Sequence, residues 1–234
     1  MIVALISAYR EGALLDSCVD SAMRRGIDAV CVFEGPVGPD TNAEPYSSHN
    51  ALRRDGVWTY AGGWKSDAAK RTAMLEWAQK HAAINAKTDD PSLWILWLDG
   101  DELLLWGEYL IDHVRRAEQE STGVGGFAIR LVELDGSVAK CHGKIVRGDL
   151  IARYVESSYQ VELHGGMVIA LPNEPICGPG GTPAAWGDRE IVLEDLAELR
   201  PPVAGEPHLL HRTMLRDPSR GVERLHEAEK GFYS

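Results

Sequence analysis

Short apolar runs alternate with longer amphipathic stretches over the first hundred residues. The apolar runs lie at 2–7, 28–33, 57–60 and 93–98. The run 93–98 contains no polar residue, which is typical of a strand buried on both faces of a sheet. Between the runs, residues 11–25 and 66–86 carry apolar side chains at helical spacing. The alternation of strands and helices predicts a parallel sheet with right-handed crossovers.

The pattern changes after Asp101. A helix is predicted near 107–121, and Asp135-Gly136 indicates a tight hairpin between two strands. The stretch 165–175 predicts a further strand, and the Gly- and Pro-rich stretch 176–188 predicts a loop. A C-terminal helix is predicted to start near Pro218. We therefore expect one integrated domain in which an α/β half (1–104) carries a β-rich half (105–234).

Composition and charge narrow the class of protein. The 234 residues include 24 Lys and Arg against 35 Asp and Glu, a formal net charge of −11. This balance disfavours a general nucleic-acid-binding or anionic-membrane surface. The four cysteines show no CxxC spacing, and no run approaches the roughly 20 apolar residues of a membrane span. We expect a cytoplasmic protein with free thiols and no membrane span.

Two aspartates follow the most apolar run, in the sequence "WILWLDGDELL". Asp99, Gly100 and Asp101 come at the carboxyl end of the predicted strand. In open α/β sheets, ligands bind in the crevice outside the carboxyl ends of the strands. Two carboxylates separated by a glycine are suited to a divalent cation, and the glycine lets the backbone approach a bound anion. The alternative is an ordinary turn, where Asp and Gly are also common.

Several motifs, taken in order, resemble one enzyme family. They are "ISAYRE" after the first strand, "CVFEGP" after the second, "DAAKRTAMLEWA" on the helix, "LDGDE", and a late "HLLHR". Together they resemble the GT-A fold glycosyltransferases of the family 2 type, closely over about 2–104 and loosely beyond. The resemblance implies a Rossmann-like, mostly parallel sheet with helices on both faces and a β-rich acceptor region. The chain departs from the family at Glu34, where an aspartate is usual, and at Thr72, where an asparagine is usual.

The resemblance also assigns residues to the nucleotide-sugar donor. The expected donor-binding residues are Ala8, Tyr9, Glu11, Glu34, Asp67, Lys70, Arg71, Asp99 and Gly100. In this assignment Glu34 accepts a hydrogen bond from a pyrimidine N3–H, and Arg71 contacts the base or the diphosphate. A purely structural alternative pairs Arg71 with Asp67 at i, i+4 spacing. Glu11 has a structural alternative too, as an acid in the first turn of a helix.

A metal site follows from the same resemblance. The implied ligands are Asp99, Asp101 and His211, with Asp99 contacting ribose or metal and His208 as a rival to His211. Mn²⁺ or Mg²⁺ suits oxygen ligands, and an imidazole favours Mn²⁺. The ion would act as a Lewis acid on the diphosphate leaving group.

Two carboxylates are candidates for the general base that an inverting transfer needs. Glu162 lies in "SSYQVELHGG" and Asp195 in "VLEDLAELR", which looks like the Glu-Asp pair of many family 2 enzymes. Each has the alternative of being a solvated surface acid, and a retaining enzyme would need neither. Arg212, Arg216 and Arg220 recur at four-residue spacing and predict a solvated basic edge, with diphosphate contact as the alternative.

The expected function is therefore a metal-dependent, hexosyltransferase-type reaction from a UDP-linked sugar to a hydroxyl acceptor. The acceptor classes left open are a glycan, a lipid carrier, a protein and a modified nucleobase. One alternative is a sugar-1-phosphate nucleotidyltransferase, which "LISAYREGALL" disfavours because it lacks a glycine cluster. The other is a non-catalytic module that binds nucleotide sugars or carbohydrate.

Overall fold

The computed structural model describes most of the first two thirds of the chain and parts of the remainder. The described residues are 1–23, 26–38, 55–85, 92–120, 124–136, 138–155, 160–164, 166, 168–170, 182–186, 189–195, 204 and 208–212. The helix expected near Pro218 lies outside them.

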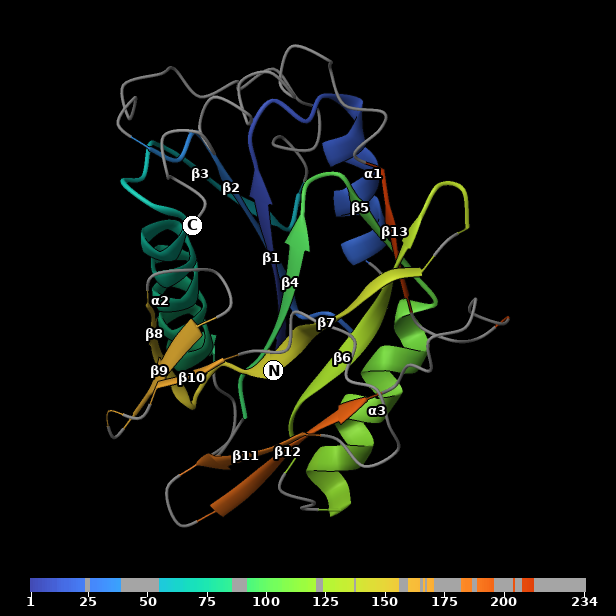
Figure 1. Cartoon of the computed structure of the whole chain (residues 1–234). Helices are drawn as coiled ribbons and strands as arrows, with labels where there is room; N and C mark the ends of the chain where they lie inside the picture. The colour runs from blue at the N-terminus through green and yellow to red at the C-terminus, as the bar shows by residue number, and fades with distance from the viewer. Residues whose placement is uncertain are drawn as a thin grey trace.

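The four strands expected in the first half are present and parallel. They are β1 (Ile2–Ala8), β2 (Ala29–Glu34), β3 (Val57–Ala61) and β4 (Trp94–Asp99), adjacent in the order β4-β1-β2-β3 (Figure 1). In register, Ser7 lies beside Asp99 and Ala8 beside Glu34. The carboxyl ends of β1, β2 and β4 therefore meet at one edge of the sheet.

Helices cover both faces of this sheet. Helices α1 (Ala13–Ala22) and α3 (Gly107–Glu120) pack on one face and α2 (Asp67–Asn85) on the other (Figure 1). Ser66 caps α2 as expected, because its Oγ accepts a 3.1 Å hydrogen bond from the Ala69 amide. Helix α1 begins two residues later than expected, after Gly12 at φ +59°. The α/β class with helices on both faces is confirmed and is consistent with a Rossmann-like GT-A fold.

The second half extends the same sheet. The strands that the second half adds to this sheet are β5 (Glu102–Leu105), β6 (Val124–Glu133), β7 (Val138–Arg147), β11 (Thr182–Trp186), β12 (Arg189–Asp195) and β13 (His208–His211). The main order is β11-β12-β6-β7-β4-β1-β2-β3, and β13 pairs with β5 and β6. Strand β7 runs antiparallel to both β4 and β6, so the sheet is mixed. The expected hairpin is confirmed, since β6 and β7 flank Asp135-Gly136.

The Gly and Pro content of the stretch 176–188 predicted a loop, but part of this stretch is a strand. Residues Thr182–Trp186 form β11, which pairs antiparallel with β12. Backbone pairing with a neighbouring strand outweighs the local turn signals there. A separate small sheet consists of β8 (Ile151–Tyr154), β9 (Gln160–Leu163) and β10 (Val168–Ala170). It lies against α2, where Thr72 Oγ1 accepts a 3.0 Å hydrogen bond from the Tyr154 amide.

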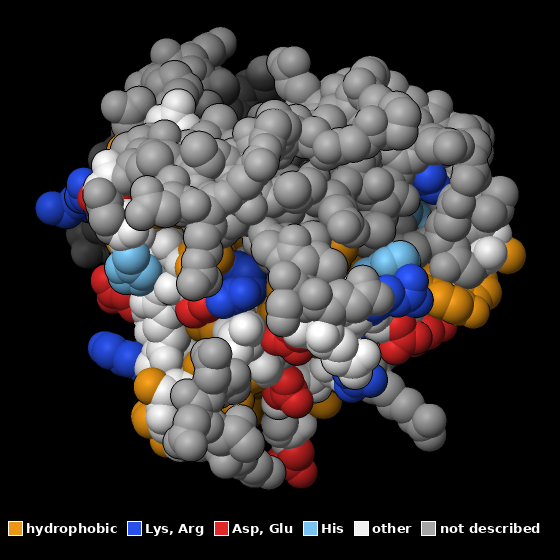
Figure 2. Space-filling model, turned by 90° about the horizontal axis from the view of Figure 1, so that it is seen from below, with side chains coloured by type: hydrophobic (Ala, Val, Ile, Leu, Met, Phe, Trp, Pro, Cys, Tyr) orange, Lys and Arg blue, Asp and Glu red, His pale blue; other side chains and the backbone are white. Residues whose placement is uncertain are grey.

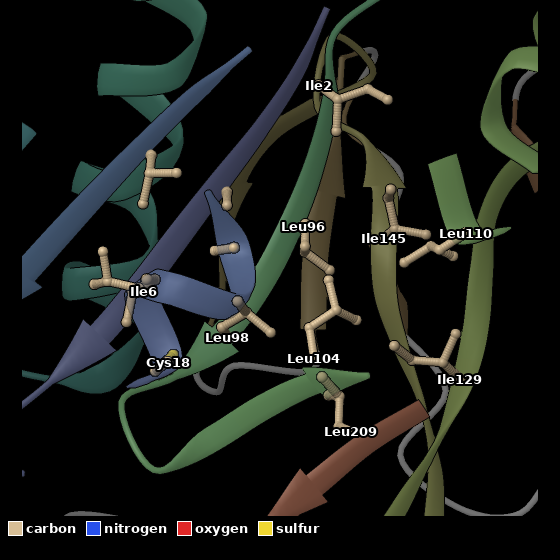
Figure 3. Packing of buried hydrophobic residues seen from close by; sticks show 14 of the residues in the cluster. Ile2, Ile6, Cys18, Leu96, Leu98, Leu104, Leu110, Ile129, Ile145 and Leu209 are labelled. Carbon is tan, nitrogen blue, oxygen red and sulfur yellow. The ribbon is translucent and has the colours of Figure 1, made fainter. Parts of the chain in front are cut away.

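The hydrophobic core has two layers, one on each face of the sheet. Because side chains alternate along a strand, Val3 and Leu5 face α2, whereas Ala4 and Ile6 face α1 and α3. Figure 3 shows the second layer, which joins strands from both halves of the chain. The residues labelled there are Ile2, Ile6, Cys18, Leu96, Leu98, Leu104, Leu110, Ile129, Ile145 and Leu209. The two halves thus share one continuous core layer.

Charged side chains lie on the described surface (Figure 2), whereas two of the cysteines lie in the core. Charged side chains of both signs lie on the described part of the face in Figure 2. Cys18 and Cys31 are buried and carry free thiols, as expected. No helix within the described ranges combines the length and the apolar character needed to cross a bilayer.

Candidate functional site

Predicted donor-binding residues gather at the carboxyl edge of the parallel strands. Ala8 ends β1, Glu34 ends β2 and Asp99 ends β4. Glu11 is buried beside them, against the turn after β4. A Cβ at Gly100 would lie 2.6 Å from Glu11 Cγ and 3.0 Å from Ala8 Cβ. Glycine at position 100 therefore allows the two turns to pack together.

Lys70 joins the ends of β1 and β2. Its Nζ donates hydrogen bonds to Ala8 O at 3.1 Å and Gly35 O at 3.2 Å, and the residue is 2% exposed. Near it, neither carboxyl oxygen of Glu34 has a hydrogen-bond partner among the described residues. Burial raises the pKa of Glu34 to about 7, with Lys70 lowering it and Glu11 raising it further. The edge thus holds a buried acid that changes charge near neutral pH.

Arg71 forms the contact with Asp67 that the structural alternative predicts, and it also contacts Asp99. Its Nη2 donates a 2.9 Å hydrogen bond to Asp99 Oδ1, and its Nε lies 3.9 Å from Asp67 Oδ1. The guanidinium also lies 5.3 Å from the centre of the Trp97 ring. The shorter contact links the helix cation directly to the first aspartate of the "LDGDE" motif.

Two further charged residues, Glu102 and Lys144, belong to the same cluster. Lys144 Nζ donates to Glu102 Oε1 at 2.8 Å and lies 3.8 Å from Asp99 Oδ2. Glu102 Oε2 accepts a 2.8 Å hydrogen bond from the Asp99 amide. Neither residue was singled out from the sequence. The available signal was a lysine within an apolar strand, "GKIVR", but nothing local connects it to Asp99.

The second aspartate of the motif is paired with the late histidine. Asp101 is fully buried, and its Oδ2 lies 3.3 Å from His211 Nε2. On the other side of the ring, His211 Nδ1 lies 3.0 Å from Glu133 Oε1. Burial lowers the pKa of His211, but the hydrogen bonds to Asp101 and Glu133 outweigh burial and raise it to about 9. His208, the rival ligand, is buried at the opposite end of β13.

The four-residue spacing predicted that Arg212 would lie on a solvated basic edge, and this prediction is wrong. Arg212 is 8% exposed, and its Nε donates a 3.1 Å hydrogen bond to Asp101 O. Its Nη2 donates to Leu14 O at 3.0 Å. The pairing of β13 with both β5 and β6 carries Arg212 over α1, so tertiary contacts bury it. The other two arginines of the series lie outside the described residues.

The candidate general bases lie in other parts of the fold. Glu162 is in β9 of the small sheet, where its Oε2 accepts a 2.7 Å hydrogen bond from Arg153 Nε. Asp195 ends β12, with its backbone beside Ala128 of β6, and its side chain is outside the description. Tyr9 lies after β1, with the Arg10 guanidinium 5.1 Å from its ring centre. The roles assigned to these residues stay predictions.

The described residues supply only part of the ligand set that a metal ion needs. Among the described residues, no three His, Cys, Asp or Glu side chains are arranged to hold a metal ion by themselves. Asp101 and His211 offer two ligand atoms 3.3 Å apart. Adjacent ligands of an octahedral ion with bonds of about 2.1 Å are separated by about 3 Å, so this pair fits one ion. Asp99, by contrast, faces the cations Arg71 and Lys144.

Comparisons with known proteins find distant structural likenesses. No protein-family model and no curated protein matches the chain. TarS from S. aureus matches with a TM-score of 0.42 and 13% identity, over 64% of this chain and 29% of that one. A structure of S. aureus TarS 1-349 matches with a TM-score of 0.40 and 14% identity, over 64% of this chain and 48% of that one.

A third solved structure is the Francisella tularensis 2-C-methyl-D-erythritol 4-phosphate cytidylyltransferase. It matches with a TM-score of 0.31 and 12% identity, over 72% of this chain and 70% of that one. The chain spans less than half the length of either TarS structure. At TM-scores this low, the likenesses carry no information on activity, which has to be inferred from the site itself.

Proposed function

We propose that this chain is a metal-dependent glycosyltransferase that moves a sugar from a UDP-linked donor to a hydroxyl acceptor. The observation that carries the proposal is the pair formed by Asp101 and His211. The family resemblance assigns metal binding to these two residues, which are far apart in the sequence. Their side chains are 3.3 Å apart, next to the edge of the sheet where Asp99 and Arg71 meet.

Asp101 and His211 would hold the divalent ion, and the remaining ligands would be donor phosphate oxygens and water. Mg²⁺ is commonly bound in this way, through one or two protein carboxylates plus substrate phosphates. When bound, the ion would neutralise the negative charge that develops on the diphosphate leaving group. Burial of Asp101 keeps the carboxylate in a low-dielectric setting where such a charge interaction is stronger.

The chain's own residues would bind and orient the donor. Arg71, fixed by Asp99 and Asp67, supplies a cation for the base or the diphosphate. Lys70 holds the ends of β1 and β2 together. In this proposal that contact would keep Glu34 in place to meet the nucleobase. In its ionised form Glu34 would accept a hydrogen bond from a pyrimidine N3–H.

The acceptor hydroxyl would lose its proton to a carboxylate if the transfer inverts the sugar. Asp195 at the end of β12 and Glu162 in β9 are the candidates. Glu162 would first have to release Arg153, with which it forms an ion pair. Asp195 has the more favourable backbone position, because it ends a strand of the central sheet that is parallel to β6.

Donor hydrolysis tests the proposal without an identified acceptor, since water can accept the sugar. A thermal-shift panel of UDP-sugars with and without Mn²⁺ identifies the donor, because a ligand that binds only the folded chain raises the melting temperature. Release of UDP from that donor is then measured for the wild type, Asp101→Asn and His211→Ala. Asp112→Asn is the matched control, because Asp112 is exposed on α3.

The proposal predicts that Mn²⁺ or Mg²⁺ is required and that Asp101→Asn and His211→Ala abolish UDP release, whereas Asp112→Asn does not. Full activity in EDTA would contradict it. Release of pyrophosphate from a nucleoside triphosphate and a sugar 1-phosphate would instead identify a nucleotidyltransferase. Binding of a nucleotide sugar without turnover would identify a non-catalytic module.

A further inference from the structure

Glu133 is a half-buried carboxylate whose position is set by the register of the sheet. It is the last residue of β6, and His211 lies directly opposite it on the neighbouring parallel strand β13. The same histidine lies opposite Glu102 on β5. His211 is therefore held between two strands, and Glu133 Oε1 lies 3.0 Å from its Nδ1.

The two ring nitrogens of His211 face different carboxylates. Nδ1 faces Glu133, whereas Nε2 lies 3.3 Å from Asp101 Oδ2. An ionised carboxylate only accepts hydrogen bonds, so a nitrogen that contacts one must donate. Without a metal ion both nitrogens can therefore donate, as the imidazolium; a metal ion would displace one of the two protons, and the ring then keeps a single N–H. Which carboxylate receives the hydrogen decides which nitrogen can bind a metal.

We propose that Glu133 is a positioning residue that holds the Nδ1–H of His211, so that Nε2 presents its lone pair to a metal ion shared with Asp101. The proposal rests on the function proposed above. Histidines that bind metals commonly donate their other N–H to a carboxylate, which fixes the tautomer and the orientation of the ring. Glu133 occupies that place here, while Asp101 occupies the place beside the ligating nitrogen.

The contacts argue against a role for Glu133 in stability alone. The side chains of Glu133 and His211 are 29% and 23% exposed, so solvent screens their interaction. A partly exposed ion pair contributes little to folding. The orientation of the ring, in contrast, depends directly on Glu133, because the peptide register alone does not select a tautomer.

The test is Mn²⁺ binding to the full chain, measured by titration calorimetry with Mn²⁺ alone and with UDP present. The variants are Glu133→Gln, Glu133→Ala and His211→Ala. Glu118→Gln is the matched control, since Glu118 lies on α3, away from the site, and also accepts a side-chain hydrogen bond, at 2.9 Å from Trp94 Nε1. The melting temperature of each metal-free variant reports on folding, and the ¹⁵N shifts of the His211 ring report on its tautomer.

We expect both Glu133 variants to weaken Mn²⁺ binding by about 10- to 100-fold. Glu118→Gln should leave it unchanged, and the metal-free Glu133→Gln variant should melt within a few degrees of that control. With diamagnetic Mg²⁺ bound, the ¹⁵N shifts of the wild-type His211 ring should show a single Nδ1–H tautomer, which Glu133→Gln should lose.

Two results would overturn the inference, and they differ in what they imply for the proposed function. Abolished binding in His211→Ala with an unchanged Mn²⁺ affinity in Glu133→Gln would remove the role of Glu133 and leave the metal site standing. Unchanged binding in His211→Ala would remove the metal site, and the role of Glu133 with it.

Discussion

Arg71 Nη2 donates a 2.9 Å hydrogen bond to Asp99 Oδ1, across 28 positions of sequence. The bond joins α2 to the end of β4, so the first aspartate of "LDGDE" is bound to a protein cation. Asp101, two residues later, is bound to His211 instead. The two aspartates of the motif therefore have different partners. Replacing Asp99 would release Arg71, whereas replacing Asp101 would remove the carboxylate partner of His211.

Replacing Arg71 should weaken donor binding. A hydrogen bond to a charged group contributes about 1.5–3 kcal/mol, so Arg71→Met should reduce the affinity for UDP by about 10-fold or more. Titration calorimetry with UDP measures the effect. Lys80→Met, which removes an exposed cation from the same helix, is the control and should have no effect. Equal UDP affinities for the two variants would show that Arg71 does not serve the donor.

The buried pair of Glu102 and Lys144 should show strong energetic coupling. Both are almost fully buried, and the Nζ–Oε1 distance is 2.8 Å. Removing one partner leaves a buried charge uncompensated, so Lys144→Met or Glu102→Gln should each cost about 3–5 kcal/mol of stability. The double variant should cost clearly less than the two single costs added together. Urea unfolding measures all three, and additive costs would rule out a mutual pair.

Glu34 should make stability fall as the pH rises towards neutrality. Its ordinary pKa is 4.5, and burial raises it to about 7 in the folded chain. Between these values the folded chain keeps a proton that the unfolded chain has lost, so raising the pH favours unfolding. Glu34→Gln removes the carboxyl group and with it this pH dependence of stability. The gain in melting temperature from Glu34→Gln should therefore be larger at about pH 8 than at about pH 5.

Calorimetry of both proteins at the two pH values provides the comparison. Glu76→Gln, on the exposed side of α2, is the control and should give the same small change at both. A gain from Glu34→Gln that is equal at both pH values would mean that Glu34 titrates normally in the folded chain.

Gly35 should tolerate substitution far less well than Gly136. Both have positive φ, +148° and +84°, so an alanine is strained at either position. At Gly136 nothing lies within 4 Å of an added Cβ, and the cost should be about 1–2 kcal/mol. At Gly35 the Cβ would overlap the carbonyl oxygen of Gly62, which cannot move without disturbing β3.

Urea unfolding of the two variants separates backbone strain from the steric clash. Gly136→Ala introduces backbone strain alone, whereas Gly35→Ala introduces backbone strain and the clash with Gly62. We expect Gly35→Ala to be the less stable by several kcal/mol, or not to fold. Similar stabilities would mean that the turn after β2 can relax away from Gly62.

The alternation of apolar runs and amphipathic stretches was sufficient to predict the first half of the fold. It predicted β1, β2, β3 and β4, and Ser66 correctly marked the start of α2. Asp135-Gly136 correctly marked the hairpin between β6 and β7. These signals are local, because burial of a strand or a helix face is recorded in residues a few positions apart. The placement of Asp99 and Asp101 at a strand end followed from the same pattern.

Only the tertiary structure decided which charged residues meet. Lys144 reaches Glu102 across 42 positions, Glu133 meets His211 across 78, and Arg212 meets Asp101 across 111. Each contact depends on which strands are neighbours and in which register they pair. Strand order is set by the packing of the whole sheet, and periodicity along the chain contains no information about it. The sequence by itself therefore determined the strands and helices of the first half, the β6–β7 hairpin and the edge at which the candidate site lies. The tertiary structure determined the partners of Asp99, Asp101 and His211, because strand order and register decide which charges lie within hydrogen-bonding distance.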